Sequence, residues 1–71
     1  RPVRLRLPGG IPDRHVLERL KAIIEEHQGN TPVEIEVAEG QVLRLGEGFQ
    51  VDPSRAVGEL RVAFGHEAVA P

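Results

Sequence analysis

Two short stretches alternate strictly between apolar and charged residues, and this pattern constrains the fold more than any other feature of the chain. Residues 3–7 read VRLRL and residues 33–37 read VEIEV. Side chains of a strand point alternately to its two faces, so each stretch predicts a strand with one apolar and one charged face. The charges are arginine on one strand and glutamate on the other, and opposite charges on neighbouring strands stabilise a sheet. We expect a solvated, self-neutralising open face, with a mixed-charge docking face for another protein as the functional alternative.

The remaining pattern predicts two helices and one further strand. Apolar residues recur at helical spacing after each of two caps, so the helices should cover about residues 13–28 and 53–64. A return strand near 42–46 should pair with 33–38 through a turn at Glu39 and Gly40. In it, Leu43 and Leu45 should point inward and Arg44 outward. The stretch FQV at 49–51 predicts a short extra strand, and HEAVA at 66–70 fits either a frayed tail or a closing edge strand.

Polar and glycine residues mark the ends of the two expected helices. Asp13 and Asp52 stand where an N-cap is needed, and Pro53 stands at the first helical position. Gly29 and Gly65 stand just beyond the expected last turns, where a glycine with a left-handed backbone is common.

These elements predict an α+β fold: a small two-layer sandwich of βαββα order with a possible extra edge strand. The sheet should be mixed or antiparallel, with both helices on one face. Leu20, Ile24, Ile35 and Leu60 should be among the most buried residues. Burial of Glu34 with exposure of Ile35 would mean that the register is off by one.

Composition limits the class of protein. The chain of 71 residues, which we expect to form one small domain, contains no cysteine. Cysteine-free composition fits a reducing cytosol, so we expect a cytoplasmic protein. No apolar run approaches the roughly 20 residues that span a bilayer, so no membrane is expected. The net charge is −2 and phenylalanine, present twice, is the only aromatic type, so we expect no direct contact with nucleic acid.

Residues with catalytic potential are scattered, and we expect no catalytic, cofactor-binding or metal-binding residues. His15 and His27 lie about 120° apart around a helix, whereas a metal pair needs i, i+4 spacing. Ser54 stands in the first turn of a helix without a base beside it, and Asp52 is explained as a cap. GEG at 46–48 lacks the further glycine and the lysine of a phosphate loop, so it reads as a bend.

Within residues 3–69, a leucine-rich helix is followed by strand and bend and then by a second helix that ends in glycine. The residues that mark this order are His27, Gly29, Thr31, Pro32, Val33, Leu45, Phe49, Val51, Pro53, Ser54, Leu60 and Gly65. In this order the chain resembles the extreme C-terminal region of the bacterial replicative DNA polymerase III alpha subunit.

The resemblance implies a role rather than a reaction. The parent protein of that family is a DNA-directed DNA polymerase, a nucleotidyltransferase whose metal-binding acids lie in a distant domain. Its C-terminal domain attaches to the tau subunit of the clamp loader. The parent chain connects this domain to other replisome subunits. The chain begins at Arg1 without an initiator methionine, so we expect it to be part of a longer protein. The resemblance implies that this part is the tau-binding C-terminal domain of a much longer polymerase chain.

The partner is expected at the second helix and the tail that follows it. There the tail should be free to order on tau, and Ala63 and Val69 should offer an exposed apolar rim. Removal of residues 66–71 should then weaken tau binding and leave melting nearly unchanged. The expected contact residues are Arg55, Glu59, Arg61, Ala63, His66, Glu67 and Val69.

Two alternatives remain open. One is a βαββα ligand-binding regulatory module paired edge to edge, with LPGGIP (residues 7–12) and GEGF (residues 46–49) as pocket candidates. The other is a weak binder of single-stranded nucleic acid that uses Arg4, Arg6 and Arg44.

Overall fold

The computed structural model describes residues 1–7, 12–38 and 40–70, and it confirms the predicted α+β class. The elements follow the expected order, with one short strand and two 3₁₀ turns in addition. They are β1 (Val3–Arg6), α1 (Arg14–Glu26), β2 (Gln28–Thr31), β3 (Val33–Ala38), β4 (Gln41–Arg44), η1 (Glu47–Phe49), α2 (Pro53–Phe64) and η2 (His66–Ala68). No described helix has the length and apolar character needed to cross a membrane.

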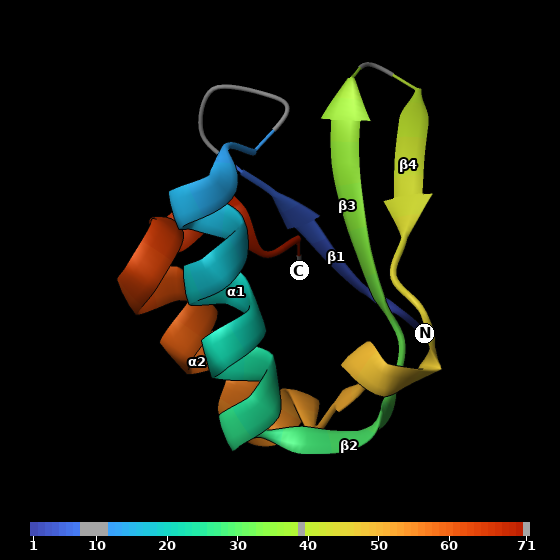
Figure 1. Ribbon diagram of the computed structural model, residues 1–71, viewed down its shortest axis with the longest axis vertical. Coiled ribbons are helices and arrows are strands. Elements are labelled where there is room, and N and C mark those ends of the chain that lie inside the picture. Colours follow the sequence, from blue (N-terminus) through green and yellow to red (C-terminus); the bar gives the residue numbers. More distant parts are fainter. Residues whose placement is uncertain (8–11, 39, 71) are drawn as a thin grey trace.

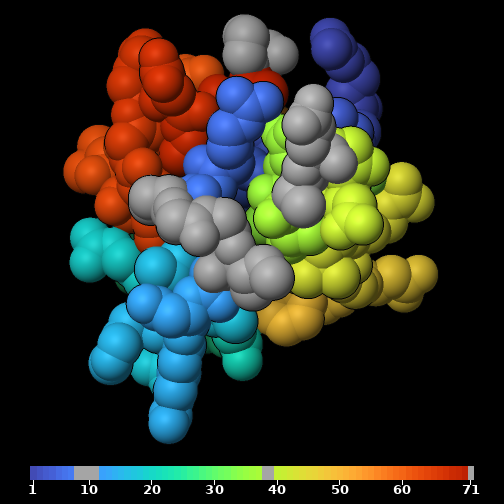
Figure 2. All heavy atoms as spheres, turned by 90° about the horizontal axis from the view of Figure 1, so that it is seen from above, coloured from blue at the N-terminus to red at the C-terminus, as the bar shows by residue number. Residues whose placement is uncertain are grey.

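The main sheet has three strands in the order β1-β3-β4, with β1 parallel to β3 and β4 antiparallel to it. Figure 1 shows α1 and α2 beside one another on one side of the molecule, while the β3–β4 hairpin projects on the other. Figure 2 agrees, because β4 (yellow) lies at the side of the molecule away from α2 (orange). The helices therefore cover the sheet unevenly.

The register of the sheet is the one that the alternating pattern predicts. Leu5 is paired with Ile35, and both are fully buried. Arg4 is paired with Glu34 on the opposite face, where Glu34 is only 4% exposed because arginine side chains lie against its carboxylate. Leu20, Ile24 and Leu60 are also buried, as expected.

Both predicted N-caps are present. Asp13 Oδ1 accepts a hydrogen bond from Val16 N at 2.9 Å, and Asp52 Oδ1 accepts one from Ser54 N at 3.1 Å. The second helix has the predicted bounds, and Gly65 ends it with φ of 109°. A glycine suits this position because side chains disfavour positive φ.

The predicted glycine cap of the first helix is wrong. Helix α1 ends at Glu26, and Gly29 lies in β2 rather than in a left-handed cap. Val51 bridges to both ends of β2, at Gln28 and Thr31, and a Cβ on Gly29 would lie 2.5 Å from Asp52 N. The glycine is required by this close approach of two backbone segments, which periodicity along one segment does not reveal. FQV contributes only Val51 to strand pairing, since Phe49 lies in η1.

Leu43 lies on the predicted face of the sheet, since it is paired with Ile35, but the core does not reach it. All of β4 is exposed, and Leu43 is 50% and Val42 41% exposed. In the part of the chain that the structure describes, the buried core draws on β1, β3, both helices, Val51 and Val69, but on no residue of β4. Leu45, just after β4, does pack against that core, as predicted. Glu39, at the expected turn, lies outside the described residues, and Gly40 has the positive φ expected there.

The tail is part of the fold, which corrects the expectation of a free segment. Ala68 and Val69 are 3% and 5% exposed. Val69 forms an antiparallel bridge with Leu5, and Ala70 N donates to Arg4 O at 3.2 Å. The tail therefore closes the edge of β1, and Val69 is a core residue instead of an exposed apolar rim.

Candidate protein-binding surface

The structure divides the predicted contact residues into three places. Arg55 is exposed in the first turn of α2. Glu59 and Ala63 border a shallow depression of about 150 Å³ between the two helices, where exposed Val62 also lies. The other four, Arg61, His66, Glu67 and Val69, line one hollow together.

This hollow, which we call the basic hollow, lies between β1 and the chain segment that follows α2. Its volume is about 580 Å³. Arg4, Arg6 and Glu36 line it from the sheet, opposite Arg61 and His66. Analysis of the sequence missed the two arginines of β1 as part of this site. Their outward direction was predictable from alternation, but their proximity to the tail depends on the Leu5–Val69 bridge.

Arg61 has a structural role that its expected exposure did not suggest. Its Nη2 donates to the carbonyl oxygen of Val69 at 3.3 Å, while its buried Nε has no hydrogen-bond partner in the part of the chain that the structure describes. The side chain is half-buried rather than exposed. Arg61 therefore holds the tail against α2 as well as lining the basic hollow.

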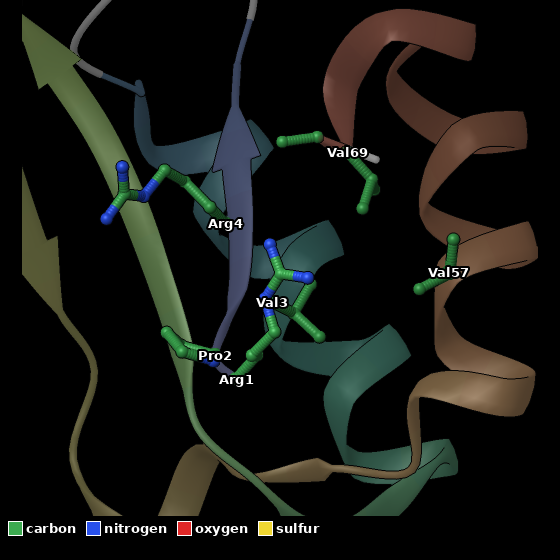
Figure 3. Close-up of a pocket in the computed structure, with 7 residues that line it drawn as sticks. Arg1, Pro2, Val3, Arg4, Val57 and Val69 are labelled. Atoms are coloured by element: carbon green, nitrogen blue, oxygen red, sulfur yellow. The ribbon is translucent and has the colours of Figure 1, made fainter.

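A second, mainly apolar hollow adjoins the first. It has a volume of about 410 Å³, and Val3, Val57 and Val69 point toward its interior, from β1, α2 and the tail (Figure 3). We call it the valine hollow. Arg4, Val69 and Ala70 line both hollows, so the two are contiguous around the docked tail. Val3 and Val57 were predicted only as core residues.

The charged face of the sheet forms a ladder of ion pairs across all three strands. Arg44 donates from Nε and Nη2 to Glu34 Oε2 at 3.1 and 2.9 Å, and Arg4 Nη2 donates to Glu34 Oε1 at 3.2 Å. The hydrogen bonds from Arg44, more than those from Arg4, hold the pKa of Glu34 below its ordinary value of 4.5. Arg6 pairs with Glu36 at 3.1 Å. The predicted cross-strand charge pairing is confirmed.

The serine, aspartate and histidine side chains considered above as possible catalysts do not form a catalytic cluster among the described residues. The Ser54 hydroxyl donates to Asp52 Oδ1 at 2.8 Å, and this bond lowers the pKa of the Asp52 carboxyl. Both ring nitrogens of His27 are buried, and neither has a hydrogen-bond partner among the described residues. Among the described residues, no three His, Cys, Asp or Glu side chains gather closely enough to hold a metal ion.

Comparisons of the chain with models of protein families, with curated proteins and with solved structures gave no match.

Proposed function

We propose that this chain is a non-catalytic protein-interaction module that tethers a replicative DNA polymerase to the tau subunit of the clamp loader, in the cytoplasm. The observation that carries the interaction role is the continuous concave surface formed by the basic and valine hollows. It brings together four of the residues expected to contact a partner, Arg61, His66, Glu67 and Val69. The identity of the partner comes from the resemblance of the sequence to the polymerase III alpha subunit.

The composition of this surface suits a protein partner. Protein interfaces commonly combine an apolar centre with a polar rim, and arginine is enriched in them. Here an apolar lining of Val3, Val57 and Val69 lies beside Arg4 and Arg61. Because the tail already docks on β1, binding of a partner would order fewer residues and would cost less conformational entropy.

A second candidate function is supported by the free edge of the sheet. β4 exposes Val42 and Leu43 and has no strand beyond it in the described part of the chain. Such an edge is a template for pairing with another chain. This observation favours the edge-paired regulatory module, which predicts a dimer of defined mass in solution.

The experiment that tests the proposed function is a binding titration of the purified chain with purified tau, followed by calorimetry. We expect a saturable complex of one-to-one stoichiometry. Glu67→Lys should change the affinity because Glu67 lines the basic hollow, whereas Lys21→Glu, on α1, reverses a charge away from it and should not. Absence of binding, together with a stable dimer, would favour the second candidate. Metal-dependent nucleotide incorporation by the chain would contradict the non-catalytic assignment.

A further inference from the structure

We propose that the basic and valine hollows together bind a short partner segment in which an acidic side chain stands next to an apolar one. This inference rests on the proposed function and specifies the chemistry of the partner. Arg4 borders both hollows, so the two side chains must be close neighbours in the bound segment.

The acidic preference follows from arginine donors that the fold leaves free. A guanidinium group has five N–H donors. Toward the described residues, Arg4 donates through Nη2, to Glu34, and Arg6 donates through Nε and Nη2, to Glu36. Their side chains are 51% and 74% exposed, so the remaining donors are accessible to a carboxylate. Arg61, which gives one hydrogen bond to the tail, adds positive charge on the other side of the basic hollow.

The apolar preference follows from the valine hollow. Val3 and Val69 are buried at its floor and Val57 is half-buried at its wall, and their side chains point into one space (Figure 3). A branched apolar side chain placed there removes apolar surface from water on both partners. The neighbouring arginines then fix its orientation through charge-assisted hydrogen bonds.

A peptide fits this surface better than a nucleic acid does. Glu36 and Glu67 also line the basic hollow and would repel a continuous phosphate backbone, whereas one carboxylate can approach the arginines between them. Among the described residues, no phenylalanine, tyrosine or tryptophan lines either hollow, so a base would find only the His66 ring to stack on.

The test uses the isotope-labelled chain and an eight-residue synthetic peptide of glycine and serine that carries one glutamate next to one leucine, followed by NMR. We expect shifts of the amide signals of Val57, Val69 and Ala70. Arg6→Gln should weaken binding about tenfold, the effect of one charge-assisted hydrogen bond. Val57→Thr, which keeps the shape of the side chain, should also weaken it. Arg14→Gln is the matched control, because Arg14 is exposed and lines neither hollow, and it should bind as the unmodified chain does.

Two further probes define the specificity. The same peptide with lysine in place of glutamate, and a single-stranded oligothymidylate, should leave the three amide signals unchanged. The proposal is overturned if the acidic peptide does not shift them, if Arg6→Gln and Val57→Thr bind like Arg14→Gln, or if either control probe binds equally well.

Binding of tau to the same variants separates this inference from the proposed function. If tau binds the unmodified chain but ignores both Arg6→Gln and Val57→Thr, the tether role stands and the peptide groove is wrong. If the acidic peptide binds in the groove while tau does not bind at all, the groove stands and tau is the wrong partner.

Discussion

The two edges of the sheet have similar sequences and opposite surroundings. At the β1 edge, Leu5 is fully buried and bridged to Val69 of the tail. At the β4 edge, Leu43 is 50% exposed although it is paired with Ile35, one of the most buried residues. The difference teaches that alternation determines the direction of a side chain, whereas burial depends on whether another segment reaches it. Tail and helices cover β1, and nothing in the described chain covers β4.

The largest expected effect comes from the same substitution on the two edges. Leu5→Ala should lower the free energy of unfolding by about 2–5 kcal/mol, because it removes a fully buried side chain and leaves a cavity. Leu43→Ala should cost less than about 1 kcal/mol, because half of the side chain is already in water. Urea unfolding of both variants measures the comparison, and equal losses would show that β4 is covered.

Removal of the tail tests the same comparison, because it uncovers the β1 edge and leaves both edges of the sheet exposed. A chain that ends at Gly65 loses buried Ala68 and Val69 and the hydrogen bond to Arg4. Its free energy of unfolding should fall by about 2–3 kcal/mol, the value of one buried valine with its neighbours. Thermal melting followed by circular dichroism would detect the loss. An unchanged melting temperature would restore the expectation of a free tail.

The close approach of β2 and Val51 should tolerate added volume as poorly as a well-packed core does. Gly29→Ala should destabilise the fold by about 1–3 kcal/mol, because the new Cβ would meet backbone atoms of Val51 and Asp52. Gly46→Ala is the matched control: no atom lies within 4 Å of the added Cβ, and the change should stay within about 0.5 kcal/mol. Equal behaviour of the two variants in urea unfolding would contradict the close approach.

The smallest expected effect concerns the charged face, where Glu34 joins Arg4 of one edge strand to Arg44 of the other. The folded pKa of Glu34 lies below 4.5, so its ionised form stabilises the fold above that pH. This contribution should disappear as the pH falls from 4.5 through the folded pKa. Glu34→Gln should therefore lower stability at pH 7 and flatten its dependence on acidic pH, as urea unfolding at several pH values would show. An identical pH profile for the variant would mean that the ladder contributes nothing.

The fold was largely predictable because its signals are local. Alternation gave the faces of β1 and β3, and caps at Asp13 and Asp52 gave the starts of both helices. The errors lie where distant segments meet. Gly29 contacts Val51, and Val69 contacts Leu5. The residue pattern within one segment does not indicate either contact, because each joins residues far apart in the sequence.

The candidate site was predictable only in part, for the same reason. Arg61, His66 and Glu67 follow one another along the second helix and tail, so a local argument could group them. Arg4 and Arg6 join them only because the tail docks antiparallel to β1. This docking is a long-range contact. The pattern of HEAVA did not predict it, because the same residues fit either a frayed tail or an edge strand.

The central claim is that the tail seals the β1 edge and thereby builds the two hollows. Hydrogen exchange at the Ala70 amide, measured by NMR on the unmodified chain, tests it most directly, because this amide donates to Arg4 O. Amides in the cooperatively folded part of a protein exchange only when that part opens. The account predicts that Ala70 exchanges within about tenfold of core amides such as that of Ile24. Exchange of Ala70 at the rate of an unstructured peptide would contradict it.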